Sequence, residues 1–146
     1  RVDASHWMYK NAPAASTVAT EYWDDPLPLQ ITGGQKTFNI IQVAVFDPDN
    51  AEKWDRVTKQ FKSADYYILS SNRAWASIPT VPDKYPQMGK YYKDLFDGKT
   101  DFKLAAKFIP WYQSLFPFHP SSWINNWLEE TFTVYDHPSV FIFKKK

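Results

Sequence analysis

The stretch FNIIQVAVF, Phe38 to Phe46, is the longest nearly apolar run in the chain. It is apolar on both faces of an extended strand, which predicts a central strand covered on both sides. From Asp49 to about Lys62 a helix is expected, because Asp49 and Glu52 form a start resembling a capping box and the apolar residues recur at helical spacing. The next strand is ADYYILSS, Ala64 to Ser71. Strand, helix and strand within about 35 residues predict a right-handed βαβ unit with a parallel strand pair.

Outward from this unit, the same kinds of pattern predict further helices and strands. They are a short opening helix capped by Asp3, a strand over Ser16 to Tyr22, an amphipathic helix marked by Tyr85, Met88, Tyr92 and Leu95 and ended at Asp97-Gly98, a strand over Phe102 to Phe108, and a terminal antiparallel hairpin of TFTVY and SVFIF around DHPS. The predicted fold class is α/β: a small three-layer Rossmann-like sheet, mainly parallel, with a C-terminal antiparallel hairpin.

Length, charge and the lack of cysteine exclude several classes of protein and site. A chain of 146 residues is long enough for one domain with its own core, so residues 1–146 are expected to form a single domain. The net charge is +1, from 17 basic and 16 acidic residues with no long basic stripe, which argues against nucleic acid as a partner. There is no cysteine, so disulfides and thiolate metal sites are excluded.

The apolar runs, the ends of the chain and its aromatic content each give an expectation about its surroundings. Phe38 to Phe46 is about half as long as a membrane helix, so the chain is not expected to span a bilayer. It starts at Arg1 without a signal-peptide pattern and stops directly after FIFKKK, so we expect a segment excised from a larger protein. Aromatic residues make up 18%, and some of these rings are expected to face a partner, a ligand or a lipid headgroup layer.

Polar side chains follow each of the first three predicted strands where the strand ends. In open parallel sheets, ligands favour the crevice outside the carboxyl ends of the strands. A polyhydroxylated ligand could be hydrogen-bonded there, or Arg73 could bind phosphate; the alternative is an internal ion pair between Arg73 and the aspartates that locks the loops together. The candidate binding residues are Glu21, Trp23, Asp24, Asp25, Asp47, Ser70, Ser71, Asn72 and Arg73, with Asp49 nearby.

The acidic stretch EYWDDPLP, Glu21 to Pro28, also raises the question of catalysis. Paired carboxylates perform acid and base work in glycoside chemistry, and Trp faces stack on sugars. Residues so close on one loop seldom flank a sugar from opposite faces, so a glycosidase using Glu21 with Asp24 or Asp25 is disfavoured. The favoured explanation is that Asp-Asp-Pro starts a turn where the strand ends. No catalytic residue is assigned within this chain.

A Trp-rich stretch and three histidines complete the candidates. The stretch PWYQSLFPFHPSSWINNWL, Pro110 to Leu128, has three prolines and six large aromatic residues. It is interpreted either as a flap covering the core or as a sugar platform or interfacial anchor, with Trp123 and Trp127 as candidate binding residues. The histidines lack the spacing of a helical zinc site, and no Gly-rich phosphate motif is present, so neither a metal nor a cofactor is expected; they are His6, His119 and His137.

Several phrases in a fixed order carry a family resemblance. They are WMYKNAP, EYWDDPLP, FDPDNAEK, ADYYILSSNR, YPQMGKYYKDLFDG and EETFTVYDHPSVFIF. Together they resemble the soluble extracytoplasmic region of multi-pass membrane glycosyltransferases related to dolichyl-phosphate-mannose protein mannosyltransferases, and of the similar YYY family of membrane proteins. The resemblance runs from about Trp7 to Phe143.

The resemblance implies an accessory domain on the extracytoplasmic face of a membrane. The parent enzyme would carry many membrane helices, use a lipid-phosphate-linked sugar as donor, and hold its catalytic carboxylate in an early loop outside this chain. The implied partners are the membrane-embedded part of the same polypeptide, a glycan or protein acceptor and the lipid-linked sugar. The alternative is a purely structural or interaction domain of a YYY-type protein.

The resemblance carries over positions without chemical roles. The matching residues are Glu21, Trp23, Asp24, Asp25, Ser70, Ser71, Asn72, Arg73, Tyr85, Pro86, Tyr91, Tyr92, Tyr135, Asp136, His137 and Pro138. The insert from Pro110 to Leu128 and the TDF after Lys99 depart from the family pattern, which puts the acceptor preference in doubt.

Overall fold

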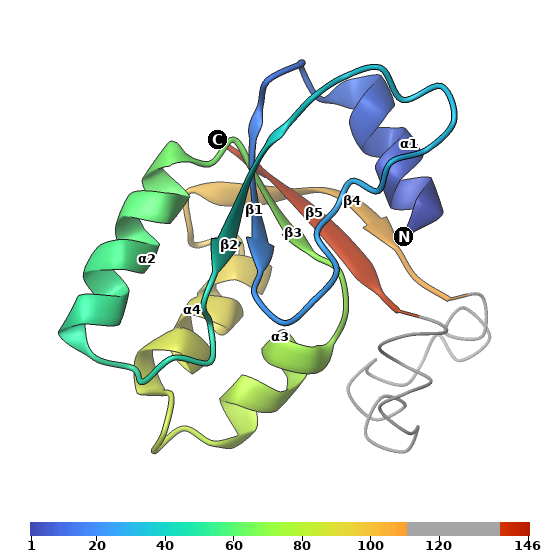
Figure 1. Cartoon of the computed structure of the whole chain (residues 1–146). Coiled ribbons are helices and arrows are strands. Elements are labelled where there is room, and N and C mark those ends of the chain that lie inside the picture. The colour runs from blue at the N-terminus through green and yellow to red at the C-terminus, as the bar shows by residue number, and fades with distance from the viewer. Residues whose placement is uncertain (111–137) are drawn as a thin grey trace.

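The computed structural model describes residues 1–110 and 138–146, which form an α/β fold around one mixed sheet (Figure 1). Within these ranges the sheet has five strands in the order β2-β1-β3-β5-β4. The strands are β1 (Thr17–Glu21), β2 (Asn39–Val43), β3 (Tyr66–Leu69), β4 (Phe102–Phe108) and β5 (Val140–Lys145). The helices are α1 (Val2–Asn11), α2 (Ala51–Ser63), α3 (Arg73–Ser77) and α4 (Pro86–Phe96), with a 3₁₀ turn at Ile78–Thr80.

The direction of the strands changes across the sheet. β1 runs parallel to β2 and to β3, whereas β5 is antiparallel to both β3 and β4. The sheet is therefore parallel in one half and antiparallel in the other, rather than mainly parallel as predicted. The predicted partner of β5 in a terminal hairpin, the TFTVY segment, lies outside the described residues.

The prediction that Phe38 to Phe46 forms the central strand is wrong. β2 lies at one edge of the sheet, and Asn39, Ile40 and Gln42 are exposed while Val43 is buried. β3 occupies the centre, and its residues are all buried. β2, α2 and β3 do form a parallel crossover, but β1 lies between the two strands, so the crossover spans a strand that the local pattern could not reveal.

Alternate residues of the central strand feed two separate hydrophobic clusters. Tyr67 and Leu69 pack in a larger cluster with residues of α2 and α4, whereas Tyr66 and Ile68 pack in a smaller one with Ala4 and Met8 of α1. This alternation is the period-two pattern of a strand buried on both faces. In Figure 1, α1 accordingly lies on the opposite side of the sheet from α2 and α4.

Two predicted helix caps are replaced by other residues. α1 begins after Arg1, and Asp3 lies inside its first turn. α2 is capped by Asn50, whose side-chain oxygen accepts a hydrogen bond from the Lys53 N–H at 2.9 Å. The predicted cap, Asp49, instead serves α4, where its Oδ2 accepts from the backbone N–H groups of Gln87 at 2.6 Å and Met88 at 3.0 Å.

The later elements follow the sequence pattern closely. α4 buries Met88, Tyr92 and Leu95 and is followed by Gly98, whose φ of +72° lies in the left-handed region that favours glycine. The strand predicted over Phe102 to Phe108 is confirmed as β4. Among the helices of the described residues, none combines the length and apolar character that crossing a membrane requires.

Candidate functional site

The loops after β1 and β3 lie side by side at the carboxyl ends of these parallel strands. The Ser70 hydroxyl donates to the backbone carbonyl of Asp25 at 2.9 Å, and the Ser71 hydroxyl donates to the Asp24 carboxylate. Arg73 Nη1 donates to the backbone carbonyl of Trp23 at 2.5 Å. The structure therefore brings these predicted site residues together, and we call Trp23, Asp24, Asp25, Ser70, Ser71 and Arg73 the carboxyl edge.

Arg1 supplies a cation at the carboxyl edge that the sequence did not indicate. Its guanidinium lies 2.6 Å from the Asp25 carboxylate and 3.3 Å from the Asp24 carboxylate, and its Nε donates to the Ser70 carbonyl at 3.4 Å. Among the described residues, Arg1, rather than Arg73, makes the ion pair with these aspartates, because Arg1 directly precedes α1 and lies over both loops. Neither a motif nor a periodic pattern marks a single arginine far away in the sequence.

The Asp24 and Asp25 carboxylates differ in accessibility. The Asp24 side chain is 5% exposed, whereas that of Asp25 is 61% exposed. Asp24 is held from two directions, by Arg1 and by the Ser71 hydroxyl, and serves to join the loops. Although its Oδ2 is paired with Arg1, most of the Asp25 side chain is exposed, so its carboxylate retains acceptor capacity for an external hydroxyl group.

Trp23 is the most exposed large apolar residue among those described, at 66%. It has a φ of +81°, which is uncommon for a non-glycine residue and costs on the order of 1–3 kcal/mol. The Tyr22 ring packs edge-on against the indole, with centroids 5.1 Å apart. The contact from Arg73 to the Trp23 carbonyl helps to hold this strained turn, which projects the aromatic pair from the surface.

Glu21 points away from solvent, into the core beneath the loop. It is 2% exposed, and the Tyr67 hydroxyl donates to its Oε1 at 3.0 Å while the Tyr92 hydroxyl donates to the same oxygen. Burial raises the pKa of Glu21 to about 7, against the two tyrosine hydrogen bonds, and the Asp24 charge adds to the rise. Its Oε2 atom finds no hydrogen-bond partner among the described residues. Glu21 is therefore not one member of an open carboxylate pair.

Asp47 and Asp49 contact residues of α2 and α4, and within the described residues neither side chain contacts the carboxyl edge. Asp47 pairs with Arg56 of α2. The Asp49 carboxylate lies 3.4 Å from Lys53 Nζ, and both side chains are 1% exposed. Burial pushes the pKa of Asp49 upward, but hydrogen bonds from Met88, Trp54 and Gln87 outweigh it, so the pKa lies below its usual value.

The remaining predicted binding residues are Asn72, Trp123 and Trp127. Asn72 is buried at the start of α3, and its side-chain oxygen has no hydrogen-bond partner within residues 1–110 and 138–146. Trp123 and Trp127 lie outside the described residues. Nowhere in the described part of the chain do three or more histidine, aspartate or glutamate residues gather in a way that could hold a metal ion.

Comparisons of the chain with protein-family models, with curated proteins and with solved structures found no match. The carboxyl edge and the adjoining Tyr22 combine an exposed aromatic pair, one accessible carboxylate and loops held by Arg1 and Arg73.

Proposed function

We propose that this chain is an accessory domain of a membrane-embedded glycosyltransferase that uses a lipid-phosphate-linked sugar donor. Its place would be the extracytoplasmic face of the membrane, and its task would be to bind a glycan or protein acceptor at the carboxyl edge rather than to catalyse transfer. The ordered resemblance from Trp7 to Phe143 supports the membrane assignment. The geometry of the edge supports the binding role.

The observation that carries the binding role is the exposed Tyr22–Trp23 pair beside Asp25. A sugar ring has one face of C–H groups that packs on an aromatic ring and a rim of hydroxyl groups that need hydrogen-bond partners. Trp23 offers the ring, and the Asp25 carboxylate accepts hydrogen bonds from hydroxyls. Arg73 holds the backbone of the turn and the Tyr22 ring packs against the indole, which lowers the entropy lost when a ligand binds.

The carboxylates of this region favour binding over catalysis. Glycoside chemistry uses two carboxyl groups that flank the reacting bond across an open groove. Glu21 is buried under two tyrosines and Asp24 is covered by Arg1 and Ser71, so Asp25 alone keeps an accessible carboxylate in the loop after β1. A single accessible carboxylate cannot supply both roles.

We also propose the finer fold description, a three-layer Rossmann-like arrangement. It is supported by the parallel half of the sheet, β2-β1-β3, and by the two hydrophobic clusters that place α1 on one face and α2 with α4 on the other. In such sheets the carboxyl ends of parallel strands are the usual ligand position, which agrees with the proposed site.

The binding role is tested by titrating the isotope-labelled domain with methyl α-mannopyranoside and with a mannosylated peptide, observed by NMR. Trp23→Ala is expected to weaken saturable binding at least tenfold while leaving the unfolding midpoint nearly unchanged, because the side chain is exposed. Leu104→Ala, which removes an exposed apolar side chain from the opposite edge strand, serves as the matched control. Equal affinities for wild type and Trp23→Ala would remove the carboxyl edge as the acceptor site.

A structural or docking role in a YYY-type membrane protein is the second candidate. It is favoured by the way the polar groups of the edge bind one another, through Arg1, Ser70 and Ser71. In that case, a photo-crosslinking amino acid at position 23 of the full polypeptide should link to its membrane-embedded part. Crosslinking to an added glycosylated acceptor instead would favour the binding role.

A further inference from the structure

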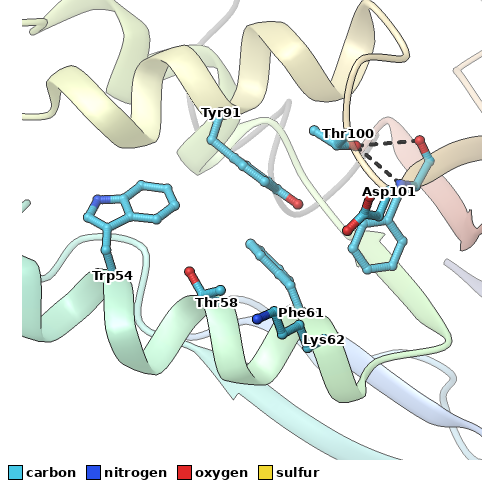
Figure 2. Close-up of a pocket in the computed structure, with 8 residues that line it drawn as sticks. Trp54, Thr58, Phe61, Lys62, Tyr91, Thr100 and Asp101 are labelled. Atoms are coloured by element: carbon cyan, nitrogen blue, oxygen red, sulfur yellow. Dashed lines mark hydrogen bonds between the residues drawn. The ribbon is translucent and has the colours of Figure 1, made fainter.

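A second aromatic site lies between α2, α4 and the start of β4, separate from the carboxyl edge. Figure 2 shows this groove, which has a volume of about 300 Å³, with Trp54, Thr58 and Tyr91 on its walls and Lys62 and Asp101 at its margin. None of the residues of the carboxyl edge lines it. This volume is at the lower end for small-molecule pockets and suits one ring-sized ligand.

The aromatic rings of the groove are held in place by contacts with one another and with Asp49. Phe61 stacks on Tyr91, with centroids 4.8 Å apart and planes 9° apart, and the edge of Phe102 packs against Phe61 at 5.9 Å. Trp54 lies 6.1 Å from Tyr91, and its indole N–H donates to Asp49 at 2.5 Å. These contacts fix the walls before any ligand arrives, which lowers the entropy lost on binding.

Polar side chains at the groove keep hydrogen-bonding capacity that contacts among the described residues do not use. The Tyr91 hydroxyl is buried and has no hydrogen-bond partner among the described residues, and in Figure 2 it points toward Asp101 and Thr100. Burial, followed by the negative charge of Asp101, raises the pKa of Tyr91, so its hydroxyl stays protonated and able to donate. No ion pair joins Lys62 to Asp101 in the described part of the chain, although both line the groove.

From this arrangement we infer that the groove binds a single pyranose ring of a glycan, as a sugar site distinct from the carboxyl edge. Sugar hydroxyls both donate and accept, and the groove offers the acceptor Asp101, the donor Lys62, and the hydroxyls of Thr58 and Tyr91, which do both. Opposite charges at its margin give no net preference for an anion or a cation. The apolar C–H face of the ring packs on Trp54.

The test is an NMR titration of the folded domain with methyl pyranosides of glucose, galactose and mannose, following the indole N–H of Trp54 and the amide of Thr58. At least one sugar should give saturable shifts at both positions. Tyr91→Phe and Asp101→Asn should each weaken that binding about tenfold, the usual effect of losing one hydrogen bond to a hydroxyl. Asp55→Asn, an exposed carboxylate of α2 that does not line the groove, is the matched control.

Three outcomes would overturn the inference. They are the absence of saturable shifts at Trp54 with every sugar, equal affinities for wild type, Tyr91→Phe and Asp101→Asn, and saturation by phenol or indole but by none of the sugars. The inference does not rest on the proposed acceptor site. Trp23→Ala should leave the Trp54 shifts unchanged, so failure at one site is distinguishable from failure at the other.

Discussion

At the scale of single residues, the buried carboxyl group of Glu21 makes the stability of the fold depend on pH. Its carboxyl group is buried with the hydroxyls of Tyr67 and Tyr92, and Asp24 adds a negative charge nearby. Burial raises the pKa from 4.5 to about 7, so the folded protein holds a proton that the unfolded chain releases at lower pH. Stability from this group is complete below pH 4.5 and is lost as the pH rises to about 7.

We therefore predict that the free energy of unfolding falls by roughly 3 kcal/mol between about pH 4.5 and 7.5 because of Glu21. Urea unfolding across this pH range measures the effect. Glu21→Gln, a neutral side chain of the same shape, should remove most of the pH dependence in this window. Parallel stability curves for the wild type and Glu21→Gln would contradict the assignment.

Sequence patterns predicted which residues gather at the carboxyl edge, but they did not predict the distant residues that contact them. The positions of the predicted strand ends indicated that the loops after β1 and β3 would lie together, and Ser70, Ser71 and Asp24 are indeed found there. The burial of Glu21 was missed because its two tyrosine partners come from β3 and α4, 46 and 71 positions away. Such long-range contacts depend on the packing of the whole sheet, which local patterns do not contain.

At the scale of elements, Asp49 joins α2 to α4. Its carboxylate accepts two N–H groups at the start of α4, contacts the buried Lys53 and binds the Trp54 indole. Asp49→Ala is predicted to lower the free energy of unfolding by about 3–5 kcal/mol, because it leaves a buried lysine without its carboxylate and removes a helix cap. Chemical denaturation measures the loss.

Asp47→Ala is the matched control for Asp49→Ala. Asp47 pairs with Arg56 at the surface, where ion pairs contribute about 0–1 kcal/mol, so its removal should change stability little. A double variant, Asp49→Ala with Lys53→Met, should recover part of the loss because no buried charge remains. Equal losses of unfolding free energy for the Asp47 and Asp49 variants would show that the buried Asp49–Lys53 contact contributes no more than a surface ion pair.

The elements that were predicted correctly are those whose pattern is set locally. α4 and β4 have clear periodicity, and Gly98 marks the stop between them. The predicted central position of β2 was wrong because an apolar run indicates a strand but not its position in the strand order of the sheet. The groove was missed for a related reason: Trp54 and Phe61 lie in the helix predicted from Asp49 to about Lys62, but Tyr91 reaches them only through packing.

At the scale of the whole molecule, the proposal of a membrane-embedded parent protein makes a direct prediction. The polypeptide that contains this chain should carry many apolar spans and an acidic loop early in its sequence, and should remain with the membrane on alkaline extraction. Sequencing the coding region on both sides and fractionating the expressed product measure this. A product without any apolar span would overturn the glycosyltransferase proposal and leave the two aromatic sites to be explained independently.

Within residues 1–110 and 138–146, the order of the strands leaves the sheet with two different edges. β4 forms one outer strand and carries the exposed Lys103 and Lys107, whose charges oppose pairing with another chain. β2 forms the other, and its exposed residues Asn39, Ile40 and Gln42 carry no charge. The isolated domain is thus predicted to self-associate through β2 when concentrated. Ile40→Lys should suppress the resulting light scattering. Leu104→Lys in β4, which already carries Lys103 and Lys107, should change it little.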